Sequence, residues 1–307
     1  MELPRYAYFG GKIIPYTEAK VGVLTHALNY GTAAFAGLRA YWNADNEQLY
    51  LFRPQDHFRR FLNSARLLMM TFDHTPESLT QVTVELLRQE GYRSNVYIRP
   101  LAFKTDEIIG VKLHGLHNDI SIVSIPFGAY VSNDTNAHVT ISSWRRIDDN
   151  MIPARGKISG AYANSALIKS DAVLSGFDEA LVLNQDGHLS EGSAMNTFIV
   201  HNGQVITPPV TENILEGITR RTVMEICHDQ LGLPVVERPI DRTEIYLCDE
   251  LFMTGTAAQI TAVTRVDHRT IGSGEMGPVT RNLRAAFEDV VYGRNPAYRH
   301  WLIPIYD

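Results

Sequence analysis

Residues 153–197 read PARGKISGAYANSALIKSDAVLSGFDEALVLNQDGHLSEGSAMNT, and they place one lysine and one glutamate where ordinary packing does not explain them. Lys157 lies just before Ser159, a residue type that commonly caps helices. An apolar-periodic segment follows Ser159 and stops at Gly176. The pattern therefore predicts a helix, with Lys157 on the loop that precedes it. Glu191 follows a β-type run and an Asp-Gly turn, among small residues that let the backbone approach a ligand closely.

This lysine and this glutamate together match the needs of one cofactor. A lysine becomes a nucleophile when its ammonium is easier to deprotonate, and a cation such as Arg155 or a desolvated pocket would have that effect on Lys157. A carboxylate such as Glu191 can keep a heterocyclic nitrogen protonated, so the pair supplies the amine and the acid that pyridoxal phosphate requires. The alternative is a solvated loop lysine and a turn carboxylate. The chain has only 6 lysines against 22 arginines, so few other lysines could take this role.

Size and composition exclude several classes of protein. A chain of 307 residues exceeds the size of a single hydrophobic core, which favours two domains. The net charge of -6 and the absence of basic clusters argue against nucleic acid as a partner. No long apolar run and no signal-like N-terminus occur, so we expect a cytoplasmic protein that does not enter a membrane. Cys227 and Cys248 lack the spacing of a disulfide framework or a zinc site, and no metal is expected.

The segment at 128–137, GAYVSNDTNA, is rich in turn-forming residues and interrupts two apolar runs near mid-chain. We therefore expect a small N-terminal α/β domain at 1–128, a linker at 129–137 and a larger C-terminal domain at 138–307. Within the first domain, helical periodicity predicts a helix from Pro54 to Met70 and another from Glu77 to Gln89.

Three glycine-containing or small-residue segments could bind an anion. A helix is predicted to begin at Gly217, and its first amides could hold a phosphate. The turn at 254–258, TGTAA, could offer further backbone amides. Residues 272–277 spell GxGxxG, but Pro278 starts the next helix at once and too little chain remains for a βαβ unit. The pattern is therefore interpreted as a strand-to-helix turn, with a nicotinamide-dependent dehydrogenase kept as the alternative.

Nine segments, in register along nearly the whole chain, resemble fold-type IV pyridoxal phosphate enzymes and most closely the branched-chain amino acid aminotransferases. They are HALNYGTAAFAGLRAY (26–41), HFRRFLNSA (57–65), VYIRPLAF (96–103), PFGAY (126–130), ARGKISGAY (154–162), LSEGSAMNTF (189–198), EGITRRTV (216–223), DELFMTGTAAQITAV (249–263) and MGPVTRNL (276–283). The resemblance implies a two-domain α/β (α+β) fold with a smaller N-terminal α/β sandwich and a larger C-terminal pseudo-barrel that binds the cofactor.

The resemblance also implies roles at the cofactor. Lys157 would form the imine bond with pyridoxal phosphate and later carry the proton between the substrate Cα and the cofactor, and Glu191 would pair with the pyridine nitrogen. The remaining cofactor contacts would come from Tyr162 at the ring's phenolic oxygen and from Arg60, Ile218, Thr219 and Thr256 at the phosphate.

A second set of residues would meet the substrates. The α-carboxylate would meet Tyr97 and the amides of Ala257 and Ala258, and the distal carboxylate of glutamate would meet Arg99. Four aromatic residues would wall the apolar side-chain pocket: Tyr30, Phe35, Phe127 and Tyr130. Gly110 and Val111 would close the site of a neighbouring subunit, in a homodimer or higher homo-oligomer.

The implied activity is a ping-pong transamination between Leu, Ile or Val and 2-oxoglutarate, with branched-chain amino acids, 2-oxo acids and glutamate as the partners. A D-amino acid or (R)-amine transaminase on the same scaffold is the alternative, and a non-catalytic binding protein is a third. The family usually has Phe-Glu-Gly where this chain has Phe35, Ala36 and Gly37. A charge near the pocket entrance is therefore expected to be missing, which leaves the substrate range open.

Overall fold

The computed structural model describes residues 3–128 and 133–307, and the chain falls into two compact units. The first comprises Met1–Gly128, Gly156–Ala161 and Asp289–Asp307, and the second comprises Ala129–Arg155 and Tyr162–Glu288. The sequence predicted one boundary, whereas the segment that carries Lys157 and the C-terminal segment both pack with the first unit. The two units are of similar length.

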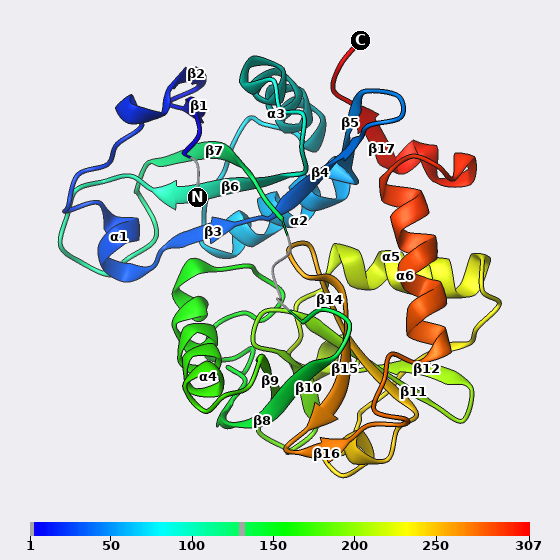
Figure 1. Cartoon of the computed structure of the whole chain (residues 1–307). Helices are drawn as coiled ribbons and strands as arrows, with labels where there is room; N and C mark the ends of the chain where they lie inside the picture. The colour runs from blue at the N-terminus through cyan, green and yellow to red at the C-terminus, as the bar shows by residue number, and fades with distance from the viewer. Residues whose placement is uncertain (1–2, 129–132) are drawn as a thin grey trace. The chain divides into compact units, whose positions relative to one another are not determined.

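An eight-stranded sheet organises the first unit (Figure 1). Its strand order is β17-β5-β4-β6-β7-β1-β2, and β3 pairs with β6 beside this path. The strands are β1 (Tyr6–Phe9), β2 (Lys12–Pro15), β3 (Ala33–Phe35), β4 (Leu38–Asn43), β5 (Gln48–Phe52), β6 (Val96–Lys104), β7 (Asn118–Pro126) and β17 (Leu302–Pro304). The edge strand β17, red in Figure 1, pairs antiparallel with the blue β5, which explains why the C-terminus belongs to this unit.

Helices cover the first sheet and close its core. α2 (Pro54–Leu67) begins at Pro54 as predicted and buries a stripe that includes Phe58, Phe61 and Ala65. α3 (Pro76–Glu90) begins with a capping box between Thr75 and Ser78. The two helices pack on each other and on β3 and β1, and the short α1 (His26–Tyr30) packs near β6.

A nine-stranded sheet of mixed direction organises the second unit. Its order is β10-β9-β8-β15-β14-β11-β12-β13, with β16 paired to β15. The strands are β8 (Ala137–Arg145), β9 (Glu179–Leu183), β10 (Leu189–Gly192), β11 (Asn196–His201), β12 (Gln204–Thr207), β13 (Val235–Glu237), β14 (Glu250–Gly255), β15 (Gln259–Val266) and β16 (Arg269–Thr270). Nearly every residue of β9, β10 and β14 is buried, as expected of strands covered on both faces.

The second unit holds α4 (Tyr162–Leu174) and α5 (Ile218–Asp229), and α6 (Pro278–Val291) begins there. α4 packs on β8 and β9, and α5 packs on β14 and β13. The predicted helix after Ser159 starts as a 3₁₀ turn at Ser159–Ala161, and the α-helix begins only at Tyr162. Across the described residues, no helix combines the length and apolarity needed to cross a membrane.

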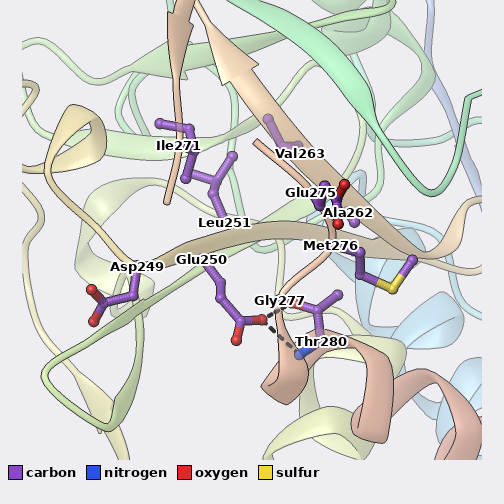
Figure 2. Close-up of a pocket in the computed structure, with 10 residues that line it drawn as sticks. All are labelled: Asp249, Glu250, Leu251, Ala262, Val263, Ile271, Glu275, Met276, Gly277 and Thr280. Atoms are coloured by element: carbon purple, nitrogen blue, oxygen red, sulfur yellow. Dashed lines mark hydrogen bonds between the residues drawn. The ribbon is translucent and has the colours of Figure 1, made fainter. Parts of the chain in front are cut away.

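The GxGxxG segment leads into α6 as a strand-to-helix turn, and its glycines have packing reasons. Figure 2 shows the Glu250 carboxylate directed at the start of α6. It accepts hydrogen bonds from the amides of Val279 (2.9 Å) and Thr280 (2.8 Å) and from the Thr280 hydroxyl (2.6 Å). A Cβ at Gly277 would lie 2.1 Å from Glu250 Cδ, so the glycine admits this carboxylate. The anion site at this helix start is therefore filled by a side chain of the protein, which argues against the dinucleotide alternative.

Candidate active site

The backbone of Lys157 is attached to the first sheet at β3. The Phe35 amide donates to the Lys157 carbonyl (2.9 Å), and Ile158 forms a β-bridge with Ala34. Close approach continues at Gly160, whose amide donates to the Gly31 carbonyl at 3.2 Å. The predicted loop before the helix is thus a short strand-like segment held by β3, and the Lys157 side chain is half-buried there.

Ser64 on α2 also holds Lys157, a role that was not predicted from the sequence. Its hydroxyl accepts from the Lys157 amide (3.1 Å) and donates to the Arg60 carbonyl (2.9 Å). One buried serine therefore ties the lysine to the helix turn that carries Arg60. The available signal was a small polar residue within the apolar stripe of α2, four residues after Arg60.

Five of the predicted residues form a cluster of rings and cations on the first sheet, which we call the β3–β6 cluster: Phe35, Tyr97, Arg99, Phe127 and Lys157. Arg99 Cζ lies 4.6 Å from the Phe35 ring centroid, and Lys157 Nζ lies 5.1 Å from the same ring. Arg99 Nη2 donates to the Tyr97 hydroxyl at 2.9 Å, and the Tyr97 and Phe127 rings are 5.2 Å apart. An amine, apolar rings and an exposed guanidinium therefore share one surface.

Gly37 makes room for this cluster. A Cβ at Gly37 would lie 2.2 Å from the Tyr97 hydroxyl, so a larger residue would displace that ring. Buried Arg39 supports the same region from β4, because its Nη2 donates to the Phe127 carbonyl (3.1 Å) and the Gly128 carbonyl (2.8 Å). No role for Arg39 was predicted from the sequence.

The structure corrects the expectation for Ala36. This side chain is fully buried and belongs to the hydrophobic core of the first unit, with Ala34, Leu38 and Ile98. Residue 36 therefore does not lie at a pocket entrance, and an alanine here fills the core rather than removing an entrance charge. Tyr130, predicted to wall the pocket, lies outside the described residues.

Arg60 and Lys157 act on the same buried histidine, His57, whereas Arg155 is paired with a carboxylate. Arg155 forms an ion pair with Glu216 (2.5 Å) in which both side chains are about half exposed. In the first unit, burial and then the charges of Arg60 and Lys157 hold the pKa of His57 well below its ordinary value. Such positive charge around a buried neutral imidazole suits a bound anion.

Tyr30 lies with the loop of Gly110 and Val111. The Tyr30 hydroxyl accepts from the Gly110 amide at 3.0 Å. Ile109 and Val111 flank this glycine, and each is 76% exposed. Tyr30 is therefore held beside the loop that carries Val111.

In the second unit, Glu191 is the most tightly held candidate. Its Oε1 lies 2.9 Å from Arg146 Nη2, and its Oε2 accepts from Asn196 Nδ2 (3.1 Å) and the Leu215 amide (3.0 Å). These three neighbours donate, as suits an ionised carboxylate, and a carboxylate has about four acceptor positions. Within the described part of the chain, one acceptor position is thus left for a further donor. Arg146 and Asn196 were not identified from the sequence, because the residue after β8 and the first residue of β11 reach Glu191 only through the fold.

The same neighbours place the start of α5. Asn196 also donates to the Leu215 carbonyl at 2.8 Å, and a Cβ at Gly217 would lie 2.0 Å from Asn196 Oδ1. Gly217 is the N-cap and offers no side-chain hydrogen bond to the amides that follow, at buried Ile218 and Thr219. A helix start of this kind can hold a phosphate.

The predicted turn at Thr256, Ala257 and Ala258 joins β14 to β15 at the same end of the sheet, because Thr254 pairs with Asn196. The Thr254 hydroxyl nearby is buried and has no hydrogen-bond partner among the described residues. Tyr162, the remaining cofactor candidate, is half-buried at the first turn of α4.

Each unit offers groups that suit pyridoxal phosphate. In the second unit, the remaining acceptor position of Glu191 suits a pyridinium N–H and the uncapped amides of α5 suit a phosphate. In the first unit, the cationic surroundings of His57 suit an anion. The amine of Lys157 beside apolar rings suits an aldehyde that forms an imine.

Known proteins agree with this assignment. The family model of amino-transferase class IV matches residues 34–266. A relative named "Probable branched-chain-amino-acid aminotransferase" from Aquifex aeolicus is 46% identical over 98% of this chain and 97% of its own. The branched-chain aminotransferase of Thermoproteus uzoniensis, solved with norvaline, matches 99% of this chain and 100% of its own at a TM-score of 0.94 and 40% identity. The branched-chain amino acid aminotransferase of Thermobaculum terrenum, solved in its PLP-form, matches 100% of both chains at a TM-score of 0.95 and 39% identity.

These matches confirm the fold-type IV architecture and the mixed α/β class predicted from the sequence. They cover both units rather than one of them. The chain therefore belongs to the class IV aminotransferases and, within that class, to the branched-chain-amino-acid aminotransferase family.

Proposed function

We propose that this protein is a pyridoxal phosphate-dependent transaminase that moves the amino group between L-leucine, L-isoleucine or L-valine and 2-oxoglutarate in a ping-pong reaction. One observation supports the substrate assignment above all others. The β3–β6 cluster places an amine, two apolar rings and an exposed guanidinium within one group of contacts. Such a surface can accept an aliphatic side chain and a second carboxylate.

When bound, pyridoxal phosphate supplies an aldehyde carbon for imine formation and a ring that accepts the electron pair released at the substrate Cα. The residues that would hold it are Lys157, Glu191, Tyr162, Arg60, Ile218, Thr219 and Thr256. Glu191, fixed by Arg146, Asn196 and Leu215, would keep the ring nitrogen protonated. The Lys157 amine, once free, would take the Cα proton of the amino acid, and its anchored backbone limits how far that amine can move.

The two substrates would use different parts of the cluster. An aliphatic side chain would pack on Phe35 and Phe127, which gains about 0.8 kcal/mol per buried CH₂. The distal carboxylate of glutamate would meet Arg99, and Tyr97 with the Ala257 and Ala258 amides would hold the α-carboxylate. Because Arg99 already lies over the Phe35 ring, the guanidinium can stay beside the aromatic rings with either substrate.

We further propose a homodimer, or a higher oligomer, in which Val111 closes the neighbouring subunit's site. The exposed apolar side chains of Ile109 and Val111, on a loop held by hydrogen bonds, support this assembly. The free, buried Cys227 and Cys248 are consistent with a cytoplasmic location. The two compact units would serve as its domains.

A substrate panel that records the absorbance of the bound cofactor tests the activity. L-leucine and L-glutamate should each convert the yellow enzyme to its amino form, and 2-oxoglutarate should restore the yellow colour. D-alanine and (R)-1-phenylethylamine should react at least about 100-fold more slowly, because the D-amino acid and (R)-amine enzymes need a differently arranged pocket. A faster reaction with either of these compounds would replace the proposal by the alternative, and a protein that stays colourless with added cofactor would refute it.

A further inference from the structure

His26, at the first position of α1, is fully buried and uses both ring nitrogens. Its Nδ1 lies 2.7 Å from the Thr32 hydroxyl, and its Nε2 lies 2.7 Å from the Gly110 carbonyl oxygen. A carbonyl oxygen can only accept, so Nε2 carries a proton and donates it. His26 thereby joins the residue that precedes β3 to the loop that follows β6.

The Gly110 residue is held on both of its backbone groups by one short helix. Its carbonyl is bound by His26, and its amide is bound by the hydroxyl of Tyr30, whose ring centroid lies 4.8 Å from that of His26. Its φ of +142° is accessible mainly to glycine. The His26 amide adds a third link, since it donates to the Asp106 carbonyl at 2.8 Å. This arrangement fixes where the chain leaves Gly110 and therefore where Val111 points.

We propose that His26 is a positioning residue for substrate selection: by holding Gly110 it sets the Tyr30 ring and the Val111 side chain as one unit. This inference rests on the proposed function, in which Val111 closes the neighbouring subunit's site, and on the expectation that Tyr30 walls the apolar pocket of its own subunit. Loosening the clamp broadens the positions of both side chains at once, so the affinity for branched-chain substrates falls. The cofactor contacts come from other residues, so cofactor binding stays intact.

Two substitutions distinguish the roles of the two ring nitrogens of His26. In His26→Gln the amide reaches the place of Nε2 and keeps a donor for Gly110, whereas in His26→Asn it reaches only the place of Nδ1 and keeps Thr32. Both variants remove the ring, so they form a matched pair. In the cofactor-loaded enzyme, hydrogen exchange at the Gly110 and Val111 amides should accelerate about tenfold in His26→Asn and stay within about threefold in His26→Gln.

The two variants should also differ in their KM for L-leucine. In His26→Asn, the KM for L-leucine should rise about tenfold, while kcat and the absorbance of the bound cofactor stay close to those of the wild type. A role confined to folding would instead lower the yield and the melting temperature and leave the KM unchanged. Equal exchange rates and equal KM values in the two variants would overturn the proposal, as would faster exchange without a change in KM.

Tyr30→Phe provides a second route if His26→Asn does not fold. It removes the acceptor for the Gly110 amide and should accelerate exchange there, whereas His26→Gln should not, and equal exchange in these two variants would overturn the proposal. The exchange measurement does not depend on transamination. If the wild type fails to turn over leucine, the proposed function fails and the clamp is still decided by exchange.

Discussion

The candidate residues of the two units are held in different ways. In the second unit, Glu191 is buried and bound by three donors, and the anion-binding candidates are backbone amides at the start of α5 and in a tight turn. In the first unit, Arg99 is exposed and held by the Tyr97 hydroxyl and two ring faces. Buried hydrogen bonds fix a group in one position, whereas ring and guanidinium packing allows small shifts. We infer that Glu191 in the second unit holds its ligand in one fixed position, whereas Arg99 in the first unit can adjust to different substrates.

Lys157→Ala should have the largest effect on activity, because the amine is the one group in the first unit with a proposed covalent role. Turnover with every substrate should fall by at least about 1,000-fold, and the visible absorbance of the bound cofactor should shift. Stopped-flow absorbance with L-glutamate measures both effects. Lys20→Ala, at an exposed lysine, is the control and should behave as the wild type. Retained turnover in Lys157→Ala would remove the assigned role.

Glu191→Gln tests the second unit. The amide cannot stabilise a protonated ring nitrogen as a carboxylate does, so kcat should fall about 100-fold, and by the same factor for leucine and glutamate. Arg146, whose side chain is 13% exposed, loses its charged partner, so the free energy of unfolding should fall by about 1–3 kcal/mol. Steady-state kinetics and chemical denaturation provide the two numbers. Glu85→Gln, on the exposed face of α3, serves as control, and unequal effects on the two substrates would contradict the assignment.

Arg99→Ala should separate the substrates. Losing one charge-assisted contact should lower kcat/KM for glutamate about 30-fold, while the value for leucine stays within about threefold. The matched control is Arg59→Ala, at an exposed arginine on α2 that pairs with Asp56. Equal losses for both substrates would show that Arg99 shapes the site as a whole. Such a result would contradict the proposal that Arg99 in the first unit distinguishes the two substrates.

Much of the fold was predictable because local signals coincide with the observed elements. Pro54 starts α2, Gly91 ends α3 in the left-handed conformation, and Pro278 starts α6. The division into units was less predictable, because it depends on pairing between distant segments. The pairing of β17 with β5 and the attachment of Lys157 to β3 join residues far apart in the sequence, and no local pattern records such pairing.

The site divides in the same way. Lys157 and Glu191 stood out because their neighbours are small and their chemistry is specific. The residues that hold them, Ser64 and Arg146, look like ordinary members of a helix and a strand end, and only their contacts mark them. The expectation for Ala36 failed for a related reason: this residue follows β3 and packs in the core with Ala34, and only the fold shows that core.

The smallest predicted effect concerns His57, whose pKa is held below its ordinary value by burial and then by Arg60. His57 binds a proton near pH 6.5 in the unfolded chain and only at lower pH in the folded chain. The free energy of unfolding therefore rises with pH between these two pKa values, and the stability that neutral His57 provides is lost as the pH falls below about 6.5. The slope from this one group is at most about 1.4 kcal/mol per pH unit.

Denaturation between pH 7.5 and 5.5 should show that slope in the wild type and a flatter one in His57→Leu. His228→Leu, at an exposed histidine that pairs with Asp229, should leave it unchanged. Because the depression comes partly from the cations of the first unit, Arg60→Gln should flatten the slope as well, and no change in that variant would contradict a positively charged half-site around Lys157.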